Sequence, residues 1–433
     1  MRLRFLLAPL ALVLVASAVP PAAAKTRWSV PLPEVRGDLL STARSVLATH
    51  PLFATSAGAA EARDYRAYVR RLAGGLREPL PLWRVLGDED LVLNYLHDPH
   101  TDLWADYSPS FSPDLLPVGF HWAKGGLVVF RIQDSPAAVR TGDRVLAIDG
   151  VPTAGVMRRL TRYASGNVEW LRQLAGEMLP YGNTLRWLGL VQGQTVPIRV
   201  AGPSGAQRTL SLELLPADEA TDIANIVGQE RFVDRFEAPP GLSEPYGREF
   251  YAYRVGRRYA VFWLTSCDDT VAFGNAVNSF FRKVRAEHTR TVVVDLQQNP
   301  GGNSAAGDDF MAHLPVRAAY AMSYPRSADV FRGRLYVLID NGTMSSGVLI
   351  AEYLSEAGYG VLAGERAGLA SGAWGNVQGF ATPDGIGYQV STMFEAPVNG
   401  VQTKTLTPAV QLPLTVRDVQ DGVDPVARWL KAL

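Results

Sequence analysis

A serine stands where a strand pattern turns directly into a helix pattern. The apolar run 335–339 leads into the sequence DNGTMSSG at 340–347, and apolar residues at three- and four-residue spacing follow it. A sharp turn of this kind projects a serine beside a helix amino terminus, whose dipole and free N–H groups can stabilise an oxyanion. Ser345 is therefore a candidate nucleophile. Because Ser and Thr are also favoured helix caps, a purely capping role competes with catalysis.

A glycine-rich loop follows the preceding strand pattern. The apolar run 291–296 continues into the sequence DLQQNPGG at 295–302. Adjacent parallel strands place their carboxyl ends together, and it is there that α/β sites are built. Tandem glycines allow backbone N–H groups to approach a substrate carbonyl closely, although a plain turn after a strand would use the same residues.

Together, the two loops resemble the tail-specific and tricorn serine peptidase family. Its pattern is Asp-Leu-x-x-Asn-Pro-Gly-Gly, followed by Asn-Gly-Thr-x-Ser-Ser at a strand–helix junction, and the sequence GE at 364–365 fits a further motif. The resemblance covers about residues 255–370. It implies an α/β core of the crotonase/Clp type. It also implies Ser345 as the nucleophile and an oxyanion hole formed by the N–H of Ser346 and by Gly301 or Gly302.

The resemblance offers two kinds of base for the nucleophile. The tail-specific branch uses a lysine soon after the GE turn, but Ala370 stands where that lysine would fall, and Lys404 is the nearest lysine in the sequence. The tricorn-like branch uses a histidine from an Asp-x-His-Thr-x-Leu segment, which the sequence DPHTDL at 98–103 resembles. An imidazole suits the role because its pKa lies near working pH. The resemblance therefore implies His100 as the general base, and a solvent-exposed loop histidine is the competing interpretation.

The third catalytic residue is ambiguous in this sequence. The family pattern has a glutamate about six residues before a proline in the C-terminal region, and the matching Pro408 places Gln402 at that position. A glutamine can accept a hydrogen bond from imidazole, but it does not stabilise imidazolium as a carboxylate does. Glu395 is the nearest carboxylate and a possible substitute. A further alternative is that neither Gln402 nor Glu395 is catalytic.

A segment in the middle of the chain resembles a PDZ domain. The sequences LPVGF at 116–120, SPA at 135–137 and TGDRVLAIDG at 141–150 carry the resemblance. Such domains bind peptides by strand addition and hold the terminal carboxylate with backbone N–H groups. The resemblance implies that Gly119 and Phe120 bind the C-terminus of a peptide. The alternative is a module that only packs against the catalytic core.

The hydrophobic patterns predict an α/β multidomain fold in four parts. Residues 25–112 show helical spacing, residues 113–216 show short strands, and residues 217–433 alternate between strand and helix patterns. Such alternation predicts an α/β core with a largely parallel sheet. We therefore expect a signal peptide at 1–24, an N-terminal helical region, an inserted PDZ-like β-rich domain and an α/β serine peptidase core.

The N-terminus resembles a secretory signal peptide. Arg2 and Arg4 precede an apolar run at 5–19, and the sequence AAA at 22–24 offers a small-residue cleavage site. A membrane anchor is the alternative, but the run is shorter than the ~20 residues that span a bilayer. We expect cleavage, export to the periplasm or the cell exterior, and no membrane span in the mature chain.

Composition narrows the partners and cofactors that we expect. The 42 basic residues balance the 42 acidic ones, and no basic stripe suggests nucleic acid. No clustered His, Cys and Asp spacing suggests a metal, and we expect no cofactor. The single cysteine, Cys267, cannot form an internal disulfide and is expected to be an inert structural thiol.

The sequence thus predicts an exported serine endopeptidase that acts on polypeptides, with recognition of the substrate C-terminus as one option. A catalytically weak or inactive pseudo-peptidase, acting as a PDZ-bearing binding or scaffold protein, is the first alternative, and Gln402 favours it. An acyl hydrolase acting on a non-peptide ester is the second, because an α/β core does not by itself specify a substrate.

Overall fold

The computed structural model describes most of the chain. The described residues are 29–56, 58–103, 112, 114–133, 139–216, 246–248, 250–321, 326–327 and 330–433. The predicted signal peptide at 1–24 and the sequence SPA at 135–137 lie outside these residues. Within the described ranges, none of the helices has both the length and the hydropathy of a transmembrane span.

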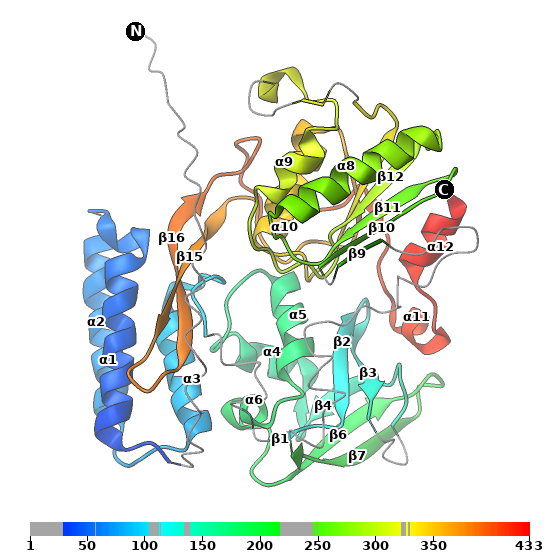
Figure 1. The fold of residues 1–433 in the computed structure, drawn as a ribbon. Coiled ribbons are helices and arrows are strands. Elements are labelled where there is room, and N and C mark those ends of the chain that lie inside the picture. The colour runs from blue at the N-terminus through cyan, green and yellow to red at the C-terminus, as the bar shows by residue number, and fades with distance from the viewer. Residues whose placement is uncertain are drawn as a thin grey trace.

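Three helices near the N-terminus share a core with a β-hairpin from the C-terminal half of the chain, and the first of the three packs directly against the hairpin (Figure 1). The hairpin pairs β15 (Ala373–Ala381) with β16 (Gly387–Glu395), and an isolated bridge joins Leu103 to Tyr388. This contact places the loop after the third helix beside the hairpin. The helices are α1 (Leu32–Thr49), α2 (Gly58–Gly75) and α3 (Leu82–Leu93), with 3₁₀ turns η1 (Pro51–Ala54) and η2 (Asn94–Leu96).

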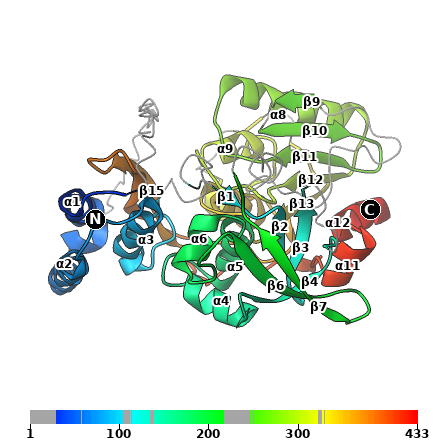
Figure 2. The same ribbon diagram turned by 90° about the horizontal axis from the view of Figure 1, so that it is seen from below.

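The middle of the chain forms an antiparallel sheet with the strand order β2-β3-β4-β6-β7, in which β5 also pairs with β4 (Figure 2). The bridge between β1 and β8 joins the two ends of this segment. The strands are β1 (Asp114–Leu115), β2 (Val118–Ala123), β3 (Gly126–Ile132), β4 (Arg144–Ile148), β5 (Val151–Pro152), β6 (Thr195–Ala201), β7 (Gln207–Glu213) and β8 (Leu215–Pro216).

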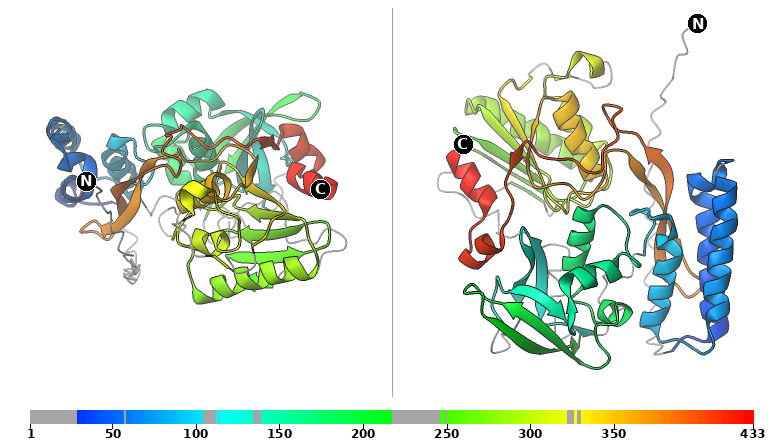
Figure 3. Two further views of the ribbon diagram at one scale, coloured as in Figure 1. Left: turned by 90° about the horizontal axis from the view of Figure 1, so that it is seen from above. Right: turned by 180° about the vertical axis from the view of Figure 1, so that it is seen from behind.

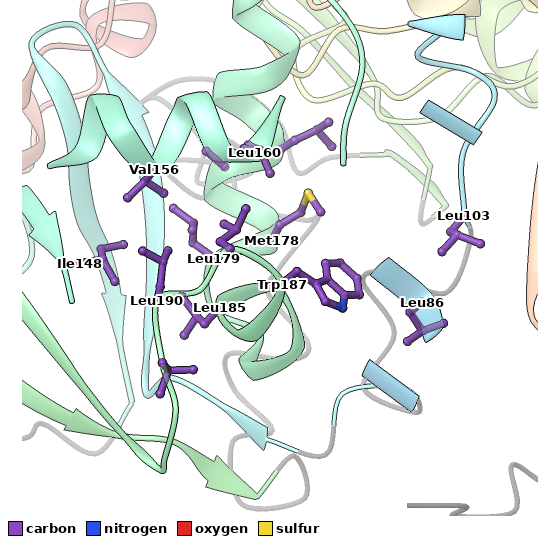
Figure 4. Packing of buried hydrophobic residues seen from close by; sticks show 14 of the residues in the cluster. Leu86, Leu103, Ile148, Val156, Leu160, Met178, Leu179, Leu185, Trp187 and Leu190 are labelled. Carbon is purple, nitrogen blue, oxygen red and sulfur yellow. The ribbon is translucent and has the colours of Figure 1, made fainter. Parts of the chain in front are cut away.

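Three helices accompany this sheet, and their apolar side chains share one core with the N-terminal helices. Figure 4 shows Trp187 reaching from this region toward the N-terminal helices. A Cβ atom at Gly87 of α3 would lie 2.8 Å from the Trp187 ring, so the helix packs directly on the indole. The three helices are α4 (Thr153–Leu160), α5 (Val168–Met178) and α6 (Gly182–Trp187).

The C-terminal half is built on a seven-stranded sheet with the order β17-β14-β13-β12-β11-β10-β9. The strands β11, β12, β13, β14 and β17 pair in parallel, as predicted, and β9 and β10 are antiparallel. The strands are β9 (Tyr246–Arg248), β10 (Tyr251–Val255), β11 (Ala260–Leu264), β12 (Thr291–Asp295), β13 (Arg334–Ile339), β14 (Val361–Gly364) and β17 (Val410–Gln411).

Helices cover both faces of this sheet, which explains its nearly uninterrupted apolar strands (Figure 3). One face packs against α8 (Val271–Ala286), α9 (Ala306–Met311) and α10 (Ser346–Glu352), and the other packs against α12 (Pro425–Ala432). The remaining short elements are η3 (Ala318–Tyr320), the π-helical turn η4 (Tyr353–Ala357) and α11 (Val416–Asp421).

Candidate active site

Ser345 lies at the junction between β13 and α10, in a strained backbone conformation. Its φ of 50° and ψ of −127° are values that residues with a side chain rarely adopt. Strain of this kind concentrates at functional sites. The side chain is partly exposed and makes no capping hydrogen bond to the helix. The capping alternative is therefore not supported, and the turn presents the hydroxyl as a nucleophile elbow would.

The glycine-rich loop lies directly against this serine. A Cβ atom at Gly301, where φ is 109°, would be 2.5 Å from Ser345 Cβ and 3.0 Å from its Oγ, so no other residue fits. The same point is 2.9 Å from the backbone nitrogen of Ser346. The Ser346 hydroxyl donates a hydrogen bond of 2.6 Å to the Gly302 carbonyl. The two loops expected to form one site thus meet at Ser345.

The hydrogen bonds of these loops decide which N–H groups remain available. The N–H of Gly301 donates to Asn299 Oδ1 at 2.8 Å, so it is already engaged. Those of Gly302 and Ser346 have no partner within the described part of the chain. Because α10 begins at Ser346, its first N–H is unsatisfied within the helix. Of the two predicted glycines, Gly302 is therefore the one with a free donor.

Asn299 and Cys267 form a buried support beneath the glycine-rich loop. Asn299 donates through Nδ2 to the Leu264 carbonyl at 2.9 Å, and its Oδ1 also accepts a contact of 3.4 Å from Cys267 Sγ. Burial raises the pKa of the Cys267 thiol to about 12. The thiol is therefore protonated at neutral pH, as expected of a structural cysteine.

A hydrogen-bonded chain from α5 holds the two loops together. Asp340 Oδ1 accepts from the N–H groups of Gln298 and Gly342 at 2.9 and 3.0 Å, and its Oδ2 accepts from Gln298 Nε2 at 2.9 Å. Gln173 Nε2, on α5, donates to Gln298 Oε1 at 2.7 Å. Gln298 itself has a φ of 58°, which is uncommon for a residue with a side chain. Gln298 therefore links the glycine-rich loop, the turn before Ser345 and α5.

Substitution of Gln298 should impair turnover more than stability. We expect Gln298→Ala to lower kcat by about tenfold, because a hydrogen bond to a charged group contributes about 1.5–3 kcal/mol and this variant loosens the turn before Ser345. Steady-state peptide cleavage and thermal unfolding would measure the two effects. Gln420→Ala is the matched control, since its amide donates to Gly142 at 2.9 Å in a different part of the structure. An equal loss in both variants would contradict the prediction.

His100 lies in the loop after η2 and is buried, so the solvent-exposed alternative is wrong. His100 is 7% exposed, and neither nitrogen of its ring has a hydrogen-bond partner among the described residues. Burial lowers the pKa of His100 from its usual value, against the opposing effects of the Asp98 carboxylate and the Trp374 backbone. The imidazole is therefore neutral at physiological pH, as a general base must be.

Asp98 fixes the loop that carries His100. Its Oδ1 accepts from the His100 N–H at 3.0 Å, and its Oδ2 accepts from the hydroxyls of Thr101 at 2.7 Å and Ser391 at 2.6 Å. His50 Nε2 lies 3.4 Å from the same carboxylate. Burial alone would raise the pKa of Asp98, but His50, His100 and Ser391 hold it below its usual value. An ionised carboxylate therefore ties this loop to β16.

The structure records no hydrogen bond between His100 and Ser345. Trp170 of α5 lies close to the loop of His100 and to Gly368. It lines a cavity of about 20 Å³ together with Pro99 and Thr101, and its ring is 3.0 Å from the Cβ position of Gly368. The N–H of Gly368 in turn donates to the Thr343 carbonyl at 3.0 Å, two residues before Ser345. Trp170 therefore lies beside the loop of His100 and, through Gly368, is linked to the turn that carries Ser345.

The two candidates for the third residue occupy different surroundings. Glu395 Cγ and His100 Cε1 lie 3.4 and 3.9 Å from the Cβ position of Gly375, so both residues reach the same point of the hairpin. Gln402 is exposed, and its Nε2 donates to the Gly372 carbonyl at 3.2 Å. Burial raises the pKa of Glu395 from its usual value. The structure therefore places Glu395 near His100 and engages Gln402 elsewhere.

The predicted peptide groove at Gly119 and Phe120 is closed. Both residues lie in β2, at a bulge, and Phe120 is buried. A Cβ atom at Gly176 of α5 would be 2.8 Å from the Phe120 carbonyl oxygen and 3.7 Å from His121 Cα. Because the helix backbone rests directly on the strand, no space remains there for an added peptide strand. The expectation that Gly119 and Phe120 hold a peptide carboxylate is therefore not supported by this conformation.

No group of three or more His, Cys, Asp or Glu side chains in the described ranges is arranged to hold a metal ion.

The family assignment rests on the catalytic half of the chain. Residues 260–412 match the model of peptidase family S41. This segment runs from β11 to β17 and contains Ser345, Gly301 and Gly302. This segment belongs to peptidase family S41. The S41 assignment makes the chain a serine peptidase, and it implies polypeptide substrates.

Solved structures extend the likeness beyond the S41 segment. Mature CPAF complexed with lactacystin aligns with a TM-score of 0.66 at 13% identity, over 93% of this chain and 97% of that one. Mature CPAF aligns with a TM-score of 0.63 at 13% identity, over 92% and 96%. The S499A mutant of CPAF aligns with a TM-score of 0.61 at 12% identity, over 92% of this chain and 96% of that one. This confirms a mixed α/β multidomain fold. No curated protein sequence matches the chain.

Sequence reasoning did not identify the residues that support this S41 site. Asp98 and Gln298 stand inside the motifs, but the motif spacing does not reveal what their side chains contact. Trp170 carries no motif at all. Gly176 within the helical segment 157–179 was a usable signal, because a glycine inside a helix often marks close packing.

Proposed function

We propose that the chain is an exported serine endopeptidase in which Ser345 attacks the peptide carbonyl. The observation that supports this most strongly is the strained elbow at Ser345, against which Gly301 fits without a side chain. The free N–H groups of Gly302 and Ser346 point to an oxyanion hole at the same place. An unstrained helix cap would require none of these features.

His100 is the base in this proposal. It removes the Ser345 proton during attack and gives it to the leaving amine. His100 then takes a proton from a water molecule that attacks the acyl-enzyme, and returns it to Ser345 Oγ as the ester bond breaks and the acid product leaves. Glu395 orients the imidazole and stabilises the imidazolium. The proposal requires the loops around Trp170 to close until His100 reaches Ser345, since catalytic hydrogen bonds often tighten only when substrate binds.

Export, domain boundaries and fold type complete the proposal. We place a cleaved signal peptide at 1–24, an N-terminal helical region at 25–112, a PDZ-like domain at 113–216 and a crotonase/Clp-like peptidase core at 217–433. The antiparallel sheet of β2, β3, β4, β6 and β7 and the parallel strands β11, β12, β13, β14 and β17 support this division. Sequencing the N-terminus of protein recovered from the cell exterior or the periplasm would test export. A mature chain that begins at Met1 would contradict it.

A fluorophosphonate probe tests the function directly, because it reacts only with an activated serine. Labelling of the wild-type protein that is lost in the Ser345→Ala variant would support the peptidase. A pseudo-peptidase that acts as a binding or scaffold protein is the second candidate. It is favoured by the missing hydrogen bond between His100 and Ser345 and by Gln402 at the family position. Absence of labelling in a folded wild-type protein would favour that candidate.

The third residue can be assigned by comparing two variants. We expect Glu395→Gln to lower kcat by up to about 10⁴-fold, because an amide in this position neither fixes the imidazole nor stabilises its charge. Gln402→Ala should change kcat less than about threefold, because its side chain bonds only Gly372 in the described structure. Steady-state peptide cleavage by both variants decides the matter. The reverse order of effects would restore Gln402 as the third residue.

A further inference from the structure

A cavity of about 350 Å³ lies where the middle sheet meets the catalytic sheet. Its walls come from the turn between β2 and β3, from α5, from the end of β14 and from Asn341, four residues before Ser345. Ligand sites in α/β folds gather at the carboxyl ends of parallel strands, where this cavity lies. Its volume is also within the range of roughly 300–1,000 Å³ that small-molecule pockets occupy.

Hydrogen bonds between distant segments hold the walls of the cavity in place. The N–H of Lys124 donates to the Leu414 carbonyl at 2.7 Å, and the N–H of Val416 donates to the Lys124 carbonyl at 3.3 Å. The N–H of Leu414 donates to Glu365 Oε1 at 3.2 Å. The C-terminal segment therefore fastens the β2–β3 turn to the end of β14, and the cavity is preformed.

The cavity is connected to the loop that carries the nucleophile. Asn341 on its wall follows Asp340, which accepts hydrogen bonds from Gln298. Gln298 is bonded to Gln173 of α5, and the residue before Gln173, Arg172, lies on the opposite wall. A molecule in the cavity therefore lies against the residues next to both ends of the chain of hydrogen bonds that holds the Ser345 turn.

The walls of the cavity carry three cations, Lys124, Arg172 and Arg366, and two carboxylates, Glu169 and Glu365. Arg172 pairs with Glu169 at 2.7 Å and lies over the Trp122 ring at 5.5 Å. Lys124 and Arg366 are exposed, and neither has an ion pair within the described residues. These two side chains favour an anionic group, and the Trp122 ring offers an apolar contact beside them.

Asn341 supplies a separate indication of a polar ligand. The residue is 6% exposed, and its buried side-chain Oδ1 accepts no hydrogen bond among the described residues. A buried acceptor without a donor is unfavourable by about 1–3 kcal/mol, so such atoms are rare unless a ligand or water completes them. A ligand with both an anionic group and an N–H donor fits these walls.

We propose that this cavity binds a carboxylate of the polypeptide substrate, paired with Lys124 and Arg366, while Asn341 Oδ1 accepts a peptide N–H. The inference rests on the proposed peptidase function and names a recognition site for its substrate. The site replaces the closed groove at Gly119 and Phe120. The carboxylate belongs either to the C-terminus or to an acidic side chain, and the two sources require different peptides to tell apart.

Three dye-labelled peptides test the proposal by fluorescence anisotropy with the full-chain Ser345→Ala protein, which should not cleave them. The first peptide has a free C-terminus and no acidic residue, the second is its amidated twin, and the third is amidated but contains one Glu. Tighter binding of the first than the second supports a C-terminal carboxylate. Tighter binding of the third than the second supports an acidic side chain. Equal affinity for all three overturns the proposal.

Protein variants locate the site. We expect Lys124→Gln with Arg366→Gln to weaken binding of the carboxylate-bearing peptide by about tenfold, because charge-assisted hydrogen bonds are lost. The matched control is Arg290→Gln with Arg332→Gln. Both are exposed cations that precede β12 and β13, at the amino ends of the strands and therefore opposite the cavity. Thermal unfolding checks the fold, and Arg366→Gln alone serves if the double variant is unstable. An equal loss in the control, or no loss in the cavity variants, overturns the site.

The outcomes separate this site from the proposed peptidase function. Normal fluorophosphonate labelling of the wild-type protein without carboxylate-dependent binding would remove the cavity proposal and leave the peptidase intact. Carboxylate-dependent binding that needs Lys124 and Arg366, in a protein that the probe does not label, would support the cavity and remove the peptidase.

Discussion

Ser345→Ala should reduce peptide cleavage by on the order of 10⁶-fold, which is the scale of loss when a catalytic serine is removed. The thermal unfolding temperature should hardly change. The side chain is partly exposed and bonds nothing in the helix that follows it, so its removal should alter the free energy of unfolding by less than about 0.5 kcal/mol. Cleavage of a fluorogenic peptide and a thermal melt measure the two quantities.

Ser355→Ala is the matched control for this experiment. Its hydroxyl donates to the Ala351 carbonyl at 2.7 Å, so the change removes a serine hydroxyl from the neighbouring turn of the same segment. The control should retain full activity. An active Ser345→Ala protein that melts several degrees lower would show that Ser345 is structural, and the proposed mechanism would then fail.

His100→Ala should cost nearly as much activity as loss of Ser345, because residues that act as one catalytic unit do not contribute additively. The pH profile should identify the same residue. Burial holds the pKa of His100 below its usual value of about 6.5, and the base works only when neutral. Activity should therefore persist as the pH falls past 6.5 and disappear as it falls through the lowered pKa.

The sign of the stability effect follows from the same burial. In the unfolded chain the pKa of His100 is about 6.5, and in the folded chain it is lower. Protonation therefore favours the unfolded chain, so the free energy of unfolding should decrease as the pH falls below about 6.5 toward the lowered pKa. His97→Asn is the control for activity, since His97 is exposed and has a φ of 52° that asparagine tolerates. Retained activity in His100→Ala would end the assignment, and Lys404 would be the remaining candidate from the sequence.

The elbow could be predicted from sequence because its determinants are local. The apolar run 335–339 lies inside β13. Gly301 of the 295–302 loop fits the space beside Ser345 because only a residue without Cβ does so. The choice between Gln402 and Glu395 could not be predicted in this way. It depends on how the β15–β16 hairpin docks beside His100, which is a contact between segments almost 300 residues apart.

The closed groove shows a second limit of sequence reasoning. The motif at 141–150 predicts a turn and strands, and β4 begins at Arg144 as those residues suggest. Whether α5 stands away from β2 or rests on it depends on how the two elements pack, including the close approach of Gly176 to the Phe120 carbonyl. Motif spacing along the chain carries no information about that separation, because it is set by tertiary packing.

The hydrogen bond from Ser391 to Asp98 spans 293 residues, and it has a consequence for biosynthesis. The ribosome releases Asp98 long before Ser391, so the loop that carries His100 lacks its anchor while most of the polypeptide is being made. Under the proposed mechanism, a nascent chain would therefore have its serine elbow before the loop of its base is tied to β16. If His100 is the base as proposed, proteolytic competence would wait for the last tenth of the chain to emerge.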